Sequence, residues 1–226
     1  MTGQGLRERK KARTRQAIAD AAARLFAERG YEQVAVSDVA REAEVSEQTV
    51  YNYFQTKEQL VTDRDQLIQE ELSRLIRTRA PGTSPAAAIR GFVLDTVEGI
   101  RRIPAGQWRG ELGFLAAISP TVHRLALEMS DRQAAALAAV LAETGTVMPE
   151  IARLRGIALA GVFQIIITEA GRRTREGQSQ NQIADELRPA IEAVLDDLDA
   201  WLTPATDRLD RAAAFRHPRD PEITGT

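Results

Sequence analysis

The stretch VSEQTVYNYFQTKEQL, residues 45–60, carries unusual polar side chains for a helix surface: Ser, Gln, Thr, Asn and Tyr stand where a solvated face usually has Lys and Glu. Val50 and Phe54 lie one helical turn apart, so both are predicted to face a core. The same spacing directs three other side chains outward: Gln48, Thr49 and Asn52. Amides can pair with adenine, a Thr methyl can contact thymine, and Tyr hydroxyls can reach phosphate. The outward face therefore predicts contact with nucleic acid.

Short helices are predicted to position this face. Val36, Val39, Ala40 and Ala43 repeat the helical spacing over barely two turns, and Ser46 suits the N-cap of the helix that follows. Two short helices joined by a tight turn predict a helix-turn-helix, whose second helix enters the major groove.

A longer amphipathic helix is predicted over residues 14–29, ahead of the helix-turn-helix. Its apolar stripe consists of Ile18, Ala21, Ala22, Leu25 and Phe26. Gly30 stands where a left-handed C-cap is expected.

A basic arm leads into this helix. Residues 6–15 hold six basic side chains and one acidic, a net charge of +5. One interpretation is a solubilising tail, and the other is contact with phosphate, for which Arg9, Lys10 and Lys11 are the candidates. Because a predicted helix-turn-helix follows the arm, phosphate contact is the favoured interpretation.

Residues 26–60, FAERGYEQVAVSDVAREAEVSEQTVYNYFQTKEQL, resemble the DNA-binding domain of the TetR family of transcriptional regulators. The resemblance rests on the F-x-x-x-G-Y pattern, followed by V-S-x-x-T-x-Y-x-Y-F-x-x-K-x-x-L. It implies base or phosphate contacts from six residues: Ser37, Gln48, Thr49, Tyr51, Tyr53 and Lys57, the last at the start of a fourth helix. Tyr53 could instead pack against the first helix. Two positions depart from the family, because Ala35 replaces the usual cap of the second helix and Glu44 replaces a turn glycine. The first departure can move the cap to Ser37.

The rest of the chain is predicted to be helical. The expected helices span residues 57–79, 84–103, 107–117, 119–143, 149–175 and 179–202. Together with the resemblance, this predicts an all-α protein with a helix-turn-helix DNA-binding domain over 1–57. A helical ligand-binding and dimerisation domain is expected over 58–203, and a flexible tail over 204–226.

Two late segments carry more apolar surface than one small core needs. Residues 157–167 are apolar almost all round, and apolar side chains recur through residues 183–202. In the family that the chain resembles, these helices pair with their symmetry mates as a four-helix dimer interface. The alternative is that both are ordinary core helices of a monomer.

The resemblance also implies an internal cavity for a small molecule. The candidate lining residues are Phe92, Trp108, Leu112, Leu115, His123, Met129, Phe163 and Gln164. Any one of them could simply belong to the core. Trp108, His123 and Gln164 can each offer a directional hydrogen bond, so the expected effector is apolar or aromatic with a few polar groups.

Other functional classes find little support in the sequence. There is no Cys, the two His lie far apart, and no nucleotide-binding or hydrolase motif occurs, so we expect no enzyme, metal site or cofactor. The longest apolar run, 156–168, is shorter than the roughly 20 residues that a bilayer needs. A cytoplasmic homodimeric repressor on a palindromic DNA operator is the expectation. The rival is a helical interaction module whose basic arm binds acidic surfaces without reading DNA.

Overall fold

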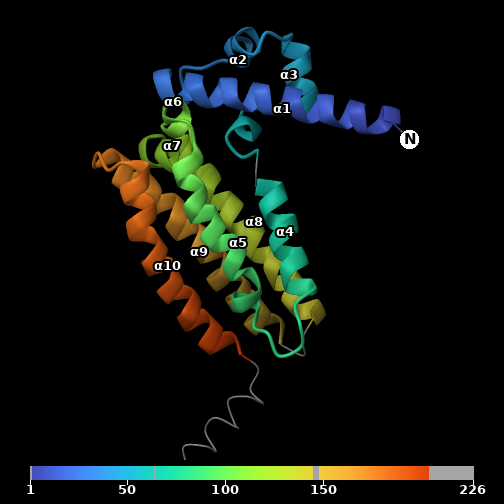
Figure 1. The fold of residues 1–226 in the computed structure, drawn as a ribbon, viewed down its shortest axis with the longest axis vertical. Helices are drawn as coiled ribbons and strands as arrows, with labels where there is room; N and C mark the ends of the chain where they lie inside the picture. Colours follow the sequence, from blue (N-terminus) through green and yellow to red (C-terminus); the bar gives the residue numbers. More distant parts are fainter. Residues whose placement is uncertain (1, 64, 145–147, 204–226) are drawn as a thin grey trace, which may run out of the picture.

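A computed structural model describes residues 2–63, 65–144 and 148–203, with side chains of the first helix from Arg7 onward. All regular structure in these ranges is helical, which confirms the predicted fold class (Figure 1). The elements are α1 (Thr2–Arg29), α2 (Val36–Glu42), α3 (Glu47–Tyr53), η1 (Glu58–Leu60), α4 (Asp65–Arg77), α5 (Pro85–Gly99), η2 (Ile100–Arg102), α6 (Ala105–Trp108), α7 (Leu112–Ile118), α8 (Pro120–Thr144), α9 (Pro149–Arg175) and α10 (Gln180–Leu202). The predicted tail, 204–226, lies outside the described residues.

Helix α1 lies across one end of the molecule, with α2 and α3 on its outer side and the helical body on its inner side (Figure 1). It begins at Thr2, so the predicted arm is the first part of the same helix. The predicted stripe is buried: Ile18, Leu25 and Phe26 pack with Val50 and Phe54 in one core. This core fixes α3 against α1.

The turn between α2 and α3 forms as predicted. The Ser46 hydroxyl accepts a hydrogen bond from the Thr49 amide, at 3.1 Å. Glu44 adopts φ 54°, a left-handed conformation that costs a residue with a Cβ on the order of 1 kcal/mol. Gly30 adopts φ 79° at the end of α1, as expected of a glycine C-cap.

The suggested shift of the α2 cap to Ser37 is wrong. Helix α2 begins at Val36 with Ala35 as its N-cap. Ala35 has no side-chain acceptor for the amides of the first turn, but the Asp38 carboxylate accepts from the Ala35 amide at 3.0 Å. This hydrogen bond lowers the pKa of the Asp38 carboxyl. This contact is one half of a capping box, the half in which the third helical residue satisfies the N-cap amide.

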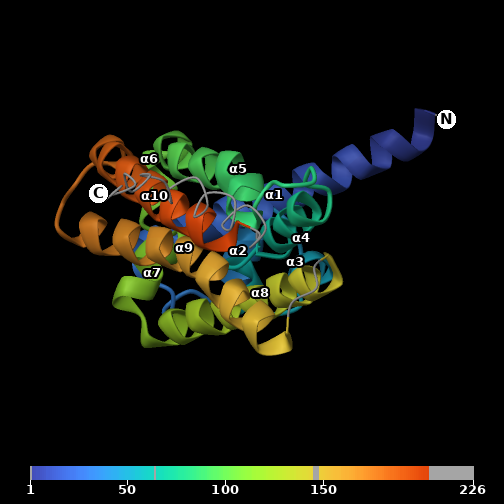
Figure 2. The ribbon, with the colours of Figure 1, turned by 90° about the horizontal axis from the view of Figure 1, so that it is seen from below.

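The body is a bundle in which α9 packs between α8 and α10, and α5 packs against α10 (Figures 1 and 2). Its core contains Leu72, Ile89, Leu137, Leu159 and Leu187 among other buried apolar residues. The structure confirms the predicted bounds of the last two helices to within one residue.

Three predicted helices are interrupted. The helix expected over 57–79 is a short turn, η1, followed by α4 from Asp65, and the one over 84–103 ends at Gly99 and continues as η2. The helix expected over 107–117 is divided into α6 and α7 around Gly110. At that point the chain touches α1, and a Cβ added at Gly110 would lie 1.8 Å from the carbonyl oxygen of Ala23.

Helix α9 is long and apolar enough, by length and composition, to cross a membrane. In the folded chain it contacts α7, α8 and α10 along its length. A core helix of a soluble protein passes the same test, so this helix does not by itself indicate a membrane protein.

Candidate nucleic-acid interface and ligand cavity

Helix α3 presents its polar side chains to solvent. Gln48 and Asn52 are exposed, and the Gln48 amide donates to the Asn52 side-chain oxygen at 3.2 Å. Tyr51 is 44% exposed, which is unusual for so large a ring. The Thr49 hydroxyl lies 2.8 Å from that of Ser46. With Val50 buried on the opposite side, this face has the amides and hydroxyls that base edges and phosphates pair with.

The other candidate DNA contacts lie at the margins of this face. Ser37 is half-buried in the first turn of α2, and Tyr53 is half-buried against the core beside α1. Lys57 precedes η1 and not α4, and its ammonium donates to the Tyr31 carbonyl at 2.5 Å. It lies 4.1 Å from the centre of the Tyr31 ring, and burial lowers its pKa. Lys57 therefore also anchors the connection between α1 and α2 at Tyr31.

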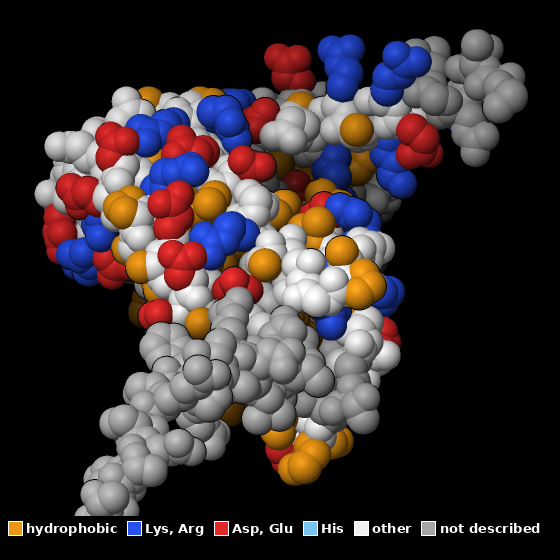
Figure 3. Space-filling model, turned by 60° about the horizontal axis from the view of Figure 1, so that its bottom comes forward, with side chains coloured by type: hydrophobic (Ala, Val, Ile, Leu, Met, Phe, Trp, Pro, Cys, Tyr) orange, Lys and Arg blue, Asp and Glu red, His pale blue; other side chains and the backbone are white. Residues whose placement is uncertain are grey.

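The arm projects from the body as a basic helix. Arg7, Arg9, Lys10, Lys11 and Arg13 are exposed. Figure 3 shows mostly basic side chains, with an acidic one among them, along this projecting part of α1, whereas basic and acidic side chains are mixed over the face of the body seen there. A projecting row of positive charge suits contact with phosphates.

Arg15, counted with the basic arm by its charge, has a different place. Its guanidinium donates to the Tyr53 carbonyl at 3.0 Å and to the Asp63 carboxylate at 2.7 Å. It also lies 4.6 Å from the centre of the Phe54 ring. Arg15 therefore ties the C-terminal end of α3 to the segment that leads into α4.

A cavity of about 370 Å³ lies between α1 and the body. Its apolar walls include Ala19 and Ala23 of α1, Ile68 of α4, Ile100 of η2 and Ile166 of α9. Asp63 and Asp65 border it where the chain passes from η1 to α4. A concave, mainly apolar space with a few polar groups is typical of small-molecule sites.

Three of the predicted ligand residues line this cavity: Trp108, Leu112 and Met129. The buried Trp108 indole Nε1 has no hydrogen-bond partner among the described residues. An unpaired buried donor costs free energy, on the order of 1–3 kcal/mol.

The other five predicted residues do not line it. Phe92 and Phe163 pack against each other in the core of the body, with ring centres 6.2 Å apart. Leu115 is buried in the core around α1, because α7 turns toward that core after Gly110. His123 is exposed on α8. Gln164 lies on α9 with its buried side-chain oxygen unpaired, away from the cavity lining.

The cavity residues absent from the predicted set include some from the body, such as Ile68 and Ile100, and others from α1 and from the segment after η1. Ala19, Asp20 and Asp63 border the cavity, although the sequence places them near the helix-turn-helix. No local sequence pattern predicts that α1 packs on the body.

Comparison with known proteins decides the family. The family model described as "Bacterial regulatory proteins, tetR family" matches residues 18–63, which include α2, α3 and the buried part of α1. The HTH-type transcriptional regulator TcmR of Streptomyces glaucescens is 28% identical over 152 residues, covering 67% of this chain and 63% of that protein. The chain belongs to the TetR family of transcriptional regulators. Proteins of this family bind DNA and are regulators, not enzymes.

Two solved structures share the TetR-family fold. NalD of Pseudomonas aeruginosa, the secondary repressor of the MexAB-OprM multidrug efflux pump, matches 86% of this chain and 98% of its own, with a TM-score of 0.53 and 17% identity. SmeT in its complex with triclosan matches 94% of this chain and 99% of its own, with a TM-score of 0.54 and 13% identity. At these identities the likeness concerns the fold. The matched part of TcmR covers about three fifths of that relative's length.

The arm and α3 are expected to contribute differently to DNA binding. Replacing Arg7, Arg9, Lys10 and Lys11 with Ala should weaken binding to all DNA and reduce its salt dependence, because fewer counterions are released. Gln48→Ala should relax base preference, with a cost of roughly 1–3 kcal/mol on the preferred sequence if the contact is bidentate. Fluorescence anisotropy on specific and random duplexes over a salt series measures both. Equal losses on the two duplexes from both variants would contradict this division.

Proposed function

We propose that this TetR-family regulator is a cytoplasmic homodimeric repressor that a small, mainly apolar effector releases from a palindromic operator. The DNA-binding domain spans residues 1–57, and the remainder to residue 203 binds the effector and the second subunit. The observation that carries the proposal is the position of the cavity, which has α1 as one wall and the helical body as the other. A ligand there touches both domains at once.

The boundary between α1 and the body is closed directly beside the cavity. Leu115 and Val122 of the body are buried in the core of α1, and the Ser119 hydroxyl donates to Glu32. Gly110 packs on the backbone of Ala23 without room for a side chain. With these contacts as a fixed edge, a ligand in the cavity would turn α1, and with it α3, relative to the body. An effector that binds the two orientations unequally shifts the equilibrium between them.

An apolar stripe on α9 supports the dimer. Leu154 is 55% exposed, Ile157 50% and Ile165 42%, and Gly161 lies between the last two. No atom lies within 4 Å of a Cβ added at Gly161. Helix α10 runs beside α9 at one side of the body (Figures 1 and 2). A contiguous apolar face with a central glycine allows close approach of a second copy.

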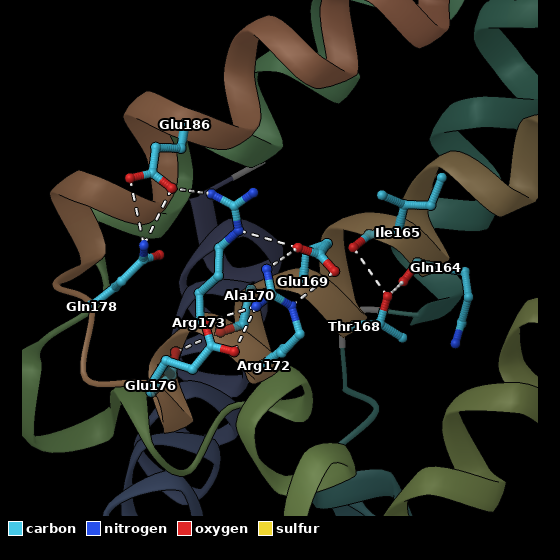
Figure 4. Close-up of polar contacts among 11 residues, drawn as sticks. Gln164, Ile165, Thr168, Glu169, Ala170, Arg172, Arg173, Glu176, Gln178 and Glu186 are labelled. Atoms are coloured by element: carbon cyan, nitrogen blue, oxygen red, sulfur yellow. Dashed lines mark hydrogen bonds and ion pairs between the residues drawn. The ribbon is translucent and has the colours of Figure 1, made fainter.

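Ion pairs hold α10 beside α9 and so shape this face (Figure 4). Arg173 donates to Glu169 on its own helix and to Glu186 of α10, at 3.2 and 2.5 Å. Gln178 also reaches Glu186, at 3.3 Å. Arg172 pairs with Glu169 and Glu176 along α9. The relative position of the two helices is thus fixed before a partner binds.

The proteins of like fold agree with this proposal in two respects. NalD is a repressor, and SmeT forms a complex with triclosan, a small aromatic molecule. The apolar walls of the cavity support an effector with a mainly apolar body.

Operator binding tests the function directly. Fragments of the source genome that the full chain retains would be selected and sequenced. The preferred duplex should then outcompete random DNA by about a thousandfold or more at physiological salt. A merely polyanion-binding protein would show no preference among the fragments, and that result would reject a DNA-reading function.

Gly161→Arg tests the dimer. Since the position is open within one chain, the substitution should leave the fold intact and place a charge in the contact between subunits. We expect light scattering to show monomers and the affinity for an operator with two half-sites to fall. The thermal unfolding transition should match that of the unsubstituted protein. Gly91→Arg is the matched control, because Gly91 is an exposed position of α5 where an added Cβ also meets no atom within 4 Å. A Gly161→Arg protein that stayed dimeric would remove this stripe from the interface.

A further inference from the structure

Asp63 stands where the cavity and the anchor of the recognition helix meet. The cavity is one of two adjoining hollows, and the second is a polar one beneath the end of α3, lined by Arg15, Asn52 and Tyr53 among others. Thr62, Asp63 and Asp65 line both. A group bound in the first hollow can therefore reach a carboxylate that serves the second.

The second hollow uses Asp63 to hold Arg15. The guanidinium donates to the carboxylate at 2.7 Å and to the Tyr53 carbonyl at 3.0 Å. The Asp63 side chain is 18% exposed and that of Arg15 43%. The carboxylate is thus the more enclosed partner, while the arginine has access to water. Such a pair can exchange its cation without leaving Arg15 buried and unpaired.

Every charged side chain among the described lining residues of the first hollow is acidic. Its charged groups there are Asp20, Asp63, Asp65 and Glu111. The Asp65 carboxylate accepts from Arg132 at 3.5 Å, and burial raises the pKa of this carboxyl. A positive charge placed at this end of the cavity would be stabilised, whereas a negative one would be repelled.

We propose that the effector carries a positively charged amine on its apolar body, and that this amine takes the place of Arg15 on Asp63. The inference rests on the proposed ligand response and specifies its chemistry. Without effector, Asp63 holds Arg15 and so the C-terminal end of α3. With effector bound, Arg15 loses Asp63 and the recognition helix loses its tie to the segment before α4. Asp63 is a positioning residue for DNA binding and a contact residue for the ligand.

Binding of matched probes to the full chain tests the ligand class without DNA. Phenylbutylamine, protonated at neutral pH, and the uncharged phenylbutanol share one apolar body and are compared by titration calorimetry. The amine should bind about tenfold more tightly, the gain typical of a partly enclosed charge pair. Equal binding of the two probes, preference for the alcohol, or no binding of the amine would overturn the proposal.

Variants of Asp63 assign the preference to this residue. Asp63→Asn should reduce the amine-to-alcohol ratio to about one, and Asp63→Glu should retain it by keeping the charge. Asp95→Asn, on an exposed position of α5 outside the cavity lining, is the control and should leave the ratio unchanged. A preference that survived in a folded Asp63→Asn protein would place the cation elsewhere and reject the assignment.

Arg15→Gln separates competition from mere structural support. Because it removes the cation that occupies Asp63, it should tighten amine binding while weakening operator binding. A structural role alone would weaken both, and that outcome would contradict the exchange. The proposed function fails separately: a chain that selects an operator but binds both probes equally loses only this inference. A chain that prefers the amine but never discriminates among DNA sequences loses the regulatory function.

Discussion

The packing of α1 between two neighbours is the constraint on which the rest of the structure depends. One side of this helix buries Ile18, Leu25 and Phe26 against α2 and α3, and another meets the body at Gly110 so closely that no Cβ fits. Helix α3 has only seven residues, too few for stability on its own. Its orientation is therefore inherited from α1, and any force on α1 from the body reaches the DNA-reading face.

The boundary between the domains combines rigid and open contact. A shared apolar core closes one part of it, and the cavity opens another, with the Gly110 contact at the cavity's own edge. A boundary that was packed throughout would leave no space for a ligand, and one that was open throughout would not hold α1 in place. Under the proposed function, a ligand in this cavity would change the orientation of α1 without a long pathway through the body. The apolar stripe of α9 lies on a different part of the body, so dimer contact and ligand binding can be combined.

Local signals predicted much of this architecture, and non-local packing explains what they missed. Pro149, Gly177 and the Ser179 cap mark the ends of α9 and α10, so their bounds followed from the sequence. The outward face of α3 followed from the burial of Val50 and Phe54. The break at Gly110 depends on the backbone of Ala23, which is distant in sequence, and no periodicity reveals it. The same contact explains why Leu115 joins the α1 core and why residues of α1 form part of the cavity wall. His123 is exposed, and no local sequence pattern predicted which way its side chain would face.

Filling the cavity from α1 tests the central claim most directly, because it needs no knowledge of the effector. Ala19→Phe places a ring in the space between α1 and the body, whereas Ala139→Phe adds the same ring to an exposed position of α8. A cooperative thermal unfolding transition first establishes that each variant is folded. The operator affinity of both proteins is then measured by fluorescence anisotropy. If cavity occupancy governs the orientation of α3, Ala19→Phe should bind the operator about 5- to 150-fold more weakly than Ala139→Phe, the usual range of coupling between two sites. Equal operator affinity of the two folded variants would contradict the account.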